Sequence, residues 1–82
     1  MSSNVLISKV VAQHVHLRRQ GREWRGRSPF SELNGENLFV SDEKNFFHDF
    51  ATGKSGDAVA FLRALGLDEG EARNRIATIG AA

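Results

Sequence analysis

The chain has 82 residues, 40% of them hydrophobic, and its 11 basic and 10 acidic residues leave a net charge of +1. At this length we expect a single domain over residues 1–82 with a small core. The absence of cysteine excludes disulfides, thiolate metal sites and a cysteine nucleophile. The N-terminus does not have the pattern of a signal peptide, and no apolar run approaches the roughly 20 residues that cross a bilayer, so we expect a cytoplasmic protein without a membrane partner.

Positive charge is concentrated between His16 and Phe30. Glu23 is the only acid in this segment, which contains five arginines: Arg18, Arg19, Arg22, Arg25 and Arg27. Acidic residues predominate between positions 42 and 68. One end of the molecule should therefore be electropositive, as an anionic partner requires. The alternative is a solvated basic hairpin that only keeps the protein in solution.

Apolar residues at helical spacing predict a first helix from about residue 4 to residue 14. Its apolar stripe consists of Leu6, Ile7, Val10 and Val11. Ser3 or Asn4 is expected to cap it. Because β-branched residues are frequent in this segment, the helix should depend on packing against the sheet rather than on its own propensity.

Alternation of apolar and polar residues predicts two strands, over residues 15–18 and 22–28, with a glycine turn between them. In the second strand Trp24 lies on one face, whereas Arg25 and Arg27 point to the other. Arginines of the two strands would then lie side by side. Such an arrangement costs stability unless an anion lies between the like charges.

A second hairpin is predicted over residues 38–41 and 45–50. Phe46 and Phe47 must face opposite sides of their strand, so we expect one in the core and the other at the surface. Residues 51–56 are expected to form a flexible connector.

Two helices are expected to close the chain. Asp57 is a good cap for a helix that runs to Leu65. Asp68 and Glu71 have the spacing of a capping box for a last helix that ends at Gly80. The expected buried positions are Ala58, Phe61, Leu62 and Leu65 in the first helix and Ala72, Ile76 and Ile79 in the second. The predicted fold is therefore α+β, a small antiparallel sheet of four or five strands with one N-terminal and two C-terminal helices.

The sequence does not favour a catalytic or cofactor site. The run Gly53-Lys54-Ser55-Gly56 does not have the spacing of a phosphate-binding loop. A serine with His48 and Asp49 has neither a nucleophile elbow nor a defined oxyanion hole. His14, His16 and His48 could be imagined in a mixed metal site, but surface or half-buried histidines are the simpler interpretation. We expect no cofactor, no small-molecule substrate and no catalysis.

Arginines and aromatic residues on a small sheet are typical of proteins that bind single-stranded nucleic acid, because the cations follow phosphates and exposed rings stack on bases. The candidates for phosphate contacts are Arg18, Arg19, Arg22, Arg25 and Arg27, with Lys44 peripheral. The candidates for stacking are Trp24 and either Phe46 or Phe47, and the alternative for Trp24 is a place in the core. The competing hypothesis is a protein-interaction or regulatory module whose basic hairpin docks on an acidic partner surface.

Several short motifs occur in a fixed order along nearly the whole chain. They are Val15-His16-Leu17, Gly21, Trp24-Arg25-Gly26, Ser28-Pro29-Phe30-Ser31, Leu38-Phe39-Val40-Ser41, Phe47 to Thr52 and Ser55 to Leu62. In this order and spacing the chain resembles the zinc-ribbon domain at the N-terminus of bacterial DNA primases. The resemblance implies a non-catalytic template-binding module that contacts single-stranded DNA in replication or mobile-element transfer. It also implies a separate primase or replication protein as a partner, with the chain standing alone or forming the front of a larger protein.

The four metal-ligand positions of that family correspond to Ser28, Ser31, Asp49 and Thr52. A Cys-His-Cys-Cys site is thus replaced by three hydroxyls and one carboxylate, whereas structural zinc depends on thiolate and imidazole donors. The resemblance therefore implies a zinc ribbon without zinc. We expect the four side chains to form a hydrogen-bonded cluster that joins the two hairpins.

Overall fold

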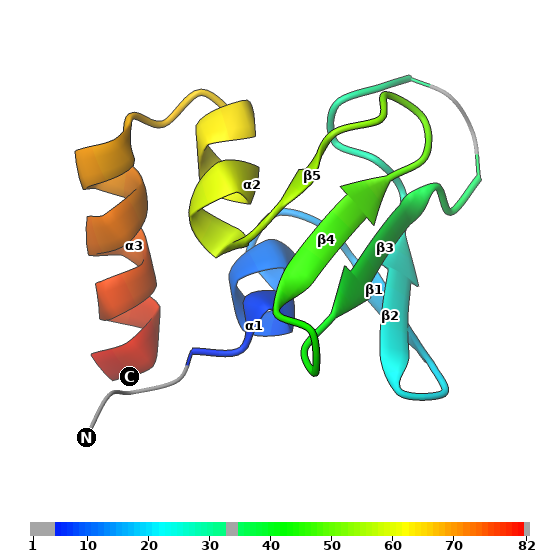
Figure 1. Ribbon diagram of the computed structural model, residues 1–82, viewed down its shortest axis with the longest axis horizontal. Helices are drawn as coiled ribbons and strands as arrows, with labels where there is room; N and C mark the ends of the chain where they lie inside the picture. Colours follow the sequence, from blue (N-terminus) through cyan, green and yellow to red (C-terminus); the bar gives the residue numbers. More distant parts are fainter. Residues whose placement is uncertain (1–4, 33–34, 82) are drawn as a thin grey trace.

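The structure is a computed structural model that describes residues 5–32 and 35–81, and in these residues it shows five strands and three helices (Figure 1). The elements are α1 (Ile7–Ala12), β1 (Leu17–Gln20), β2 (Glu23–Gly26), β3 (Leu38–Ser41), β4 (Phe46–Asp49), β5 (Ser55–Gly56), α2 (Ala58–Ala64) and α3 (Glu69–Ala81). The strands form one antiparallel sheet in the order β1-β2-β3-β4-β5. This α+β architecture is the predicted one. No helix in the described ranges is long and apolar enough to cross a membrane.

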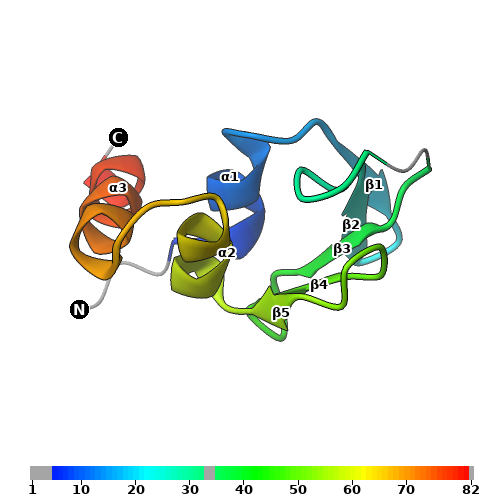
Figure 2. The same cartoon turned by 90° about the horizontal axis from the view of Figure 1, so that it is seen from above.

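The described helices lie on one side of the sheet. Figure 2 shows α1 and α2 next to the strands and α3 beyond them, packed on the side away from the sheet. Among the described residues, no helix covers the other face of the sheet. We call this helix-free face the open face of the sheet.

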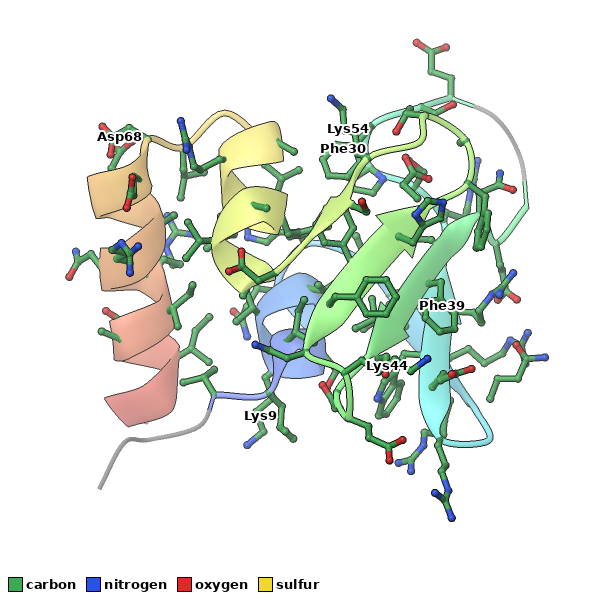
Figure 3. All side chains as sticks on the ribbon, in the orientation of Figure 1. Lys9, Phe30, Phe39, Lys44, Lys54 and Asp68 are labelled. Carbon is green, nitrogen blue, oxygen red and sulfur yellow. The ribbon has the colours of Figure 1, made fainter. Side chains whose placement is uncertain are left out.

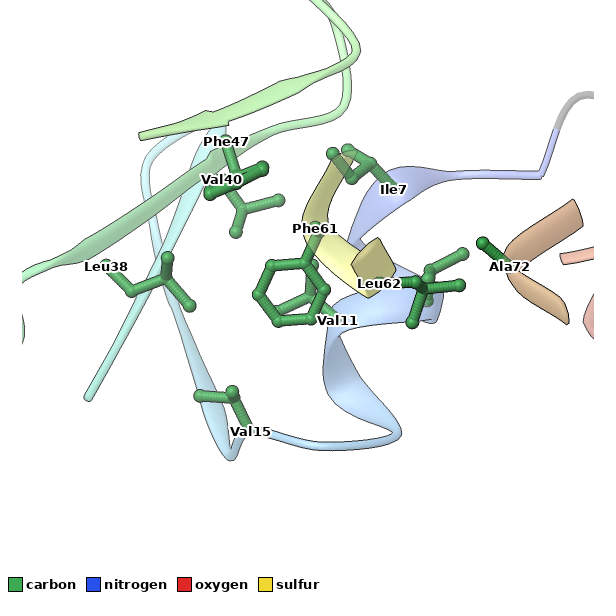
Figure 4. Close-up of a cluster of buried hydrophobic side chains, with 10 residues drawn as sticks. Ile7, Val11, Val15, Leu38, Val40, Phe47, Phe61, Leu62 and Ala72 are labelled. Carbon is green, nitrogen blue, oxygen red and sulfur yellow. The ribbon is translucent and has the colours of Figure 1, made fainter. Parts of the chain in front are cut away.

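The hydrophobic core lies between the sheet and the helices α1 and α2, and it extends to Ala72 of α3 (Figure 4). Its buried side chains are Ile7, Val10, Val11, Val15, Leu38, Val40, Phe47, Phe61, Leu62 and Ala72. The ring of Phe61 is in edge contact with Phe47 at a centroid distance of 5.2 Å and with Phe30 at 5.5 Å. These rings connect α2 to β4 and to the turn after β2, so the two hairpins and the helices share one core.

The start of α1 differs from the prediction. The helix follows Leu6, whose own side chain makes no capping hydrogen bond. Ser3 and Asn4 lie outside those residues. Leu6 is 44% exposed and does not belong to the buried stripe. Ser8 is buried, and its N–H and its hydroxyl both donate to Asp42, each at 2.8 Å. A contact with the β3–β4 turn thus holds the start of α1. The spacing of residues within the helix could not predict this contact, because Asp42 is distant in the sequence.

The connector predicted over residues 51–56 contains a short strand, β5, which pairs with β4. Its second residue, Gly56, has a φ of +149°. A Cβ atom at this position would lie 2.5 Å from the Cβ of Ala60 in α2. Glycine therefore permits the close approach of β5 to α2, and a two-residue strand of this kind has no side-chain alternation by which it could be predicted.

The predicted caps of the last two helices are confirmed. Asp57 accepts a hydrogen bond from the N–H of Ala60 at 2.9 Å. Asp68 and Glu71 form the reciprocal capping box, with distances of 2.8 and 3.2 Å. Helix α3 extends to Ala81, one residue beyond the predicted end. Its stripe is as predicted, with Ala72 buried and Ile76 and Ile79 half-buried.

Candidate nucleic-acid interface

A row of basic and aromatic residues crosses the open face of the sheet. Successive strand partners in this row are Arg18, Arg25, Phe39, His48 and Ser55, one from each strand. Neighbouring positions along the strands, among them Leu38, Val40 and Phe47, point into the core. Because side chains alternate between the two faces of a strand, the row faces away from the helices. Figure 3 shows Phe39 in front of the strands on this face.

The aromatic side chains on this face touch one another. The ring centroids of Phe39 and Phe46 are 5.9 Å apart, and those of His48 and Phe50 are 4.4 Å apart. The guanidinium of Arg25 lies 6.0 Å from the ring centre of Phe39 and 5.8 Å from that of Phe50, so it joins the two pairs. We call Phe39, Phe46, His48 and Phe50 the aromatic platform. Phe50 is 60% exposed, which suits a ring that stacks on a base rather than on the core.

The two arginines at the edge of the platform lie side by side, as the alternation predicted. Arg18 and Arg25 are direct partners in the β1–β2 ladder. Glu36 contacts both arginines: its carboxylate accepts two hydrogen bonds from Arg18, and its carbonyl oxygen accepts one from Arg25. The hydrogen bond with Glu36 and its charge raise the pKa of Arg18, and the same hydrogen bond lowers the pKa of Glu36.

Trp24 and Arg19 lie on the opposite face of the sheet. They are partners in the β1–β2 ladder, and the Arg19 guanidinium lies 5.2 Å from the centre of the Trp24 ring. The indole N–H donates to Asp42 at 3.2 Å. Both residues border a groove of about 450 Å³ between α1 and β1. The half-buried Trp24 therefore does not join the aromatic platform, contrary to its assignment as a stacking residue beside Phe46.

The structure separates Phe46 from Phe47. Phe47 is 1% exposed and packs edge-on against Phe61, so it cannot stack on a base, and its assignment to the binding site is wrong. Phe46 is half-buried and belongs to the platform. Arg22 is exposed in the β1–β2 turn, and Lys44 is exposed in the β3–β4 turn at the same end of the sheet. Lys44 is labelled in Figure 3.

Three platform residues were not predicted as site residues. Phe39, His48 and Phe50 occupy alternate positions that continue the face defined by Arg25 and Phe46. The sequence contains a signal for them, because residues 39, 46, 48 and 50 alternate with core residues of the second hairpin. Arg27 is exposed just after β2, at the opposite end of the sheet from the β1–β2 turn.

A buried carboxylate, that of Asp49, lies at the end of β4 in the second hairpin. Asp49 is 0% exposed, and one of its oxygens accepts hydrogen bonds from the hydroxyls of Ser28, at 2.7 Å, and Thr52, at 2.6 Å. Its other oxygen accepts the N–H of Ala51 at 3.1 Å. Ser31 is half-buried in the turn that follows Ser28. These hydrogen bonds join Ser28, Asp49 and Thr52, three of the four side chains of the predicted cluster, and they link the segment after β2 to the β4–β5 connection.

The pKa of Asp49 is set by opposing effects. Burial alone would raise it, but hydrogen bonds from Thr52, Ser28 and Ala51, together with the nearby His48, lower the pKa below its ordinary value of 3.8. The charged form is therefore favoured in the folded state, so the stability that it contributes is present above the ordinary carboxyl pKa and is lost as the pH falls through the lower folded-state pKa.

We expect urea denaturation to give a smaller difference in stability between about pH 7 and pH 3 in Asp49→Asn than in the unmodified protein. An equal difference in the two proteins would contradict this assignment.

The arrangement of strands and helices defines a class of protein, the primase zinc-binding domain. The crystal structure of the Aquifex aeolicus primase, with its zinc-binding and RNA polymerase domains, is similar to this chain with a TM-score of 0.79. The similarity covers 95% of this chain and 21% of that one, at 27% sequence identity.

The chain belongs to the CHC2 zinc-finger family, whose sequence profile matches residues 1–79. The DNA primase of Lactococcus lactis subsp. lactis is 38% identical to it over 63 residues, which are 77% of this chain and 10% of that primase. The DNA primase of Geobacillus stearothermophilus is 39% identical over 72 residues, which are 87% of this chain and 12% of that primase. The chain thus spans about a tenth of the length of these relatives. The predicted resemblance is confirmed, and the chain is homologous to a domain of an enzyme.

The residues at the metal position of this chain do not fit zinc. Hydroxyls and a single carboxylate occupy the four positions, and both oxygens of that carboxylate, on Asp49, are engaged in hydrogen bonds within the chain. Within residues 5–32 and 35–81, no three histidine, aspartate or glutamate side chains gather in a way that could hold a metal ion.

Proposed function

We propose that the chain is a non-catalytic module that binds single-stranded DNA through the open face of its sheet and that folds without zinc. The observation that carries the proposal is the row from Arg18 to His48, in which two arginines border the aromatic platform. The arginines would hold backbone phosphates while the rings stack on bases.

A single strand suits this surface better than a duplex. The platform is a flat sheet face, and rings can stack only on bases that are not already stacked in a helix. The long helix α3 lies beyond α1 and α2, on the side of the molecule away from the platform (Figures 1 and 2). No element on the platform side is therefore suited to enter a major groove in the part of the chain that the structure describes.

The proposal assigns binding rather than chemistry to this chain. The chain corresponds to about a tenth of each related primase, so the polymerising activity of such an enzyme would come from other residues. We propose a separate primase or replication protein as the partner that supplies it. The Asp49 cluster would take over the linking role of zinc, since it connects the same two parts of the sheet.

Fluorescence anisotropy of a labelled single-stranded oligonucleotide tests this proposal at salt concentrations of about 50 and 200 mM. We expect affinity to fall steeply with salt and to be about tenfold lower in Arg25→Ala/Arg27→Ala, because cations that contact phosphates are lost. The control is Arg73→Ala/Arg75→Ala, which removes the same charge from exposed positions of α3. No binding at low salt, or an equal loss in both double variants, would contradict the proposal and direct attention to an acidic protein partner.

A further inference from the structure

Both arginines at the edge of the aromatic platform, Arg18 and Arg25, donate hydrogen bonds to Glu36 of the same chain. The Glu36 carboxylate accepts hydrogen bonds from Nε of Arg18 at 3.0 Å and from Nη2 of Arg18 at 2.5 Å. The carbonyl oxygen of Glu36 accepts a third hydrogen bond, from Nη2 of Arg25 at 3.2 Å. One residue thus engages both arginines of the row.

This arrangement has the geometry of an anion site. Two parallel N–H groups of a guanidinium bind the two oxygens of a carboxylate in the same way as they bind two oxygens of a phosphate. Arg25 is half-buried, and its guanidinium is placed between the rings of Phe39 and Phe50, so its position does not depend on Glu36 alone. A phosphate at this place would lie beside rings on which the adjoining bases could stack.

The carboxylate can be displaced. The Arg18 and Glu36 side chains are 55% and 40% exposed, and exposed ion pairs contribute little net stability because water solvates the separated charges well. A nucleic-acid strand offers a phosphate for the same guanidinium and releases counterions when it binds. Replacement of the Glu36 carboxylate by a phosphate should therefore reduce the binding affinity by a modest but measurable factor.

We propose that Arg18 and Arg25 form a backbone-phosphate site that Glu36 occupies in the free protein, and that a nucleic-acid strand must displace the Glu36 carboxylate to bind. This inference rests on the proposed function. Glu36 then lowers the affinity of the module and reduces the number of free cations that a strand encounters. The chain would bind weakly and reversibly, and removal of the carboxylate would strengthen binding.

The test is the variant Glu36→Gln in the anisotropy titration. We expect it to bind the single strand about three to ten times more tightly than the unmodified protein, with a salt dependence steeper by about 0.7 in log K per log salt, the increment of one additional phosphate contact on a single strand. The matched control is Glu69→Gln, which makes the same charge change at an exposed acid paired with Arg73 at 2.8 Å in α3. Its distance from the platform should limit its effect to less than about twofold, because salt screens remote charges.

A double-mutant cycle completes the test. In an Arg18→Ala background, the gain from Glu36→Gln should be clearly smaller, because the carboxylate hydrogen-bonds to Arg18. An equal effect of Glu36→Gln and Glu69→Gln, or weaker binding in Glu36→Gln, would overturn the inference while the proposed function stands. If neither the unmodified protein nor Glu36→Gln binds the oligonucleotide at low salt, the proposed function itself fails, and this inference fails with it.

Discussion

Replacement of Asp49 by alanine is expected to lower the free energy of unfolding by about 3 kcal/mol, because three hydrogen bonds to a buried carboxylate are lost, one of them from the buried Ser28. The hydroxyls of Ser28 and Thr52 and the N–H of Ala51 would all lose their acceptor. For a chain of this size the melting temperature should fall by roughly 12–24 °C. Ser31→Ala is the matched control at another of the four positions, and it should cost less than about 1 kcal/mol because Ser31 is only half-buried.

Thermal melting followed by circular dichroism measures both variants. The unmodified protein should melt at the same temperature with added zinc and with a chelator, since hydroxyls and one hydrogen-bonded carboxylate are not the donors on which structural zinc depends. Equal and negligible effects of the two substitutions would contradict the stabilising role of the cluster. A melting temperature that rises with zinc and falls with chelator would contradict the zinc-free fold.

Phe39→Ala is expected to weaken binding of a single-stranded oligonucleotide about tenfold, because one stacking ring contributes roughly 1–3 kcal/mol. Phe39 lies at the centre of the row and contacts both Phe46 and Arg25. The salt dependence of binding should stay unchanged, because no phosphate contact is removed. This combination distinguishes stacking from the charge effect expected of an arginine variant.

The control for Phe39→Ala is Leu6→Ala, which removes an exposed large apolar side chain directly before α1, away from the platform. We expect its affinity to equal that of the unmodified protein. Both variants are measured by anisotropy after their melting temperatures are compared, so that a folding defect is not mistaken for a binding defect. A loss of affinity in Leu6→Ala but not in Phe39→Ala would contradict the assignment of the platform.

Features that depend on local spacing could be predicted from the sequence. The Asp57 cap and the Asp68 and Glu71 capping box are defined by residues three positions apart, and the structure contains both. The opposite placement of Phe46 and Phe47 follows from the two-residue period of a strand, although the period does not show which ring is buried. The proximity of Arg18 and Arg25 likewise follows from a short turn between two strands.

Features that depend on register between distant strands could not be predicted in the same way. The platform forms because Arg25 lies opposite Phe39 and Phe39 lies opposite His48. These pairings depend on the register of three strands, which is set by the packing of the sheet against the core. The contact between Arg18 and Glu36 joins residues 18 positions apart across a connecting segment. Trp24 lies opposite the core residue Val40 of β3, and its indole N–H donates to Asp42 of a different hairpin.

The most direct test of the central claim is a titration of the isotope-labelled protein with a short single-stranded oligonucleotide, followed by amide chemical shifts. The open face of the sheet predicts that the largest shifts occur at Arg25, Phe39, His48 and Phe50, with α3 little affected. Shifts confined to the groove between α1 and β1 around Trp24 would contradict the claim and would place the binding surface on the opposite face of the sheet.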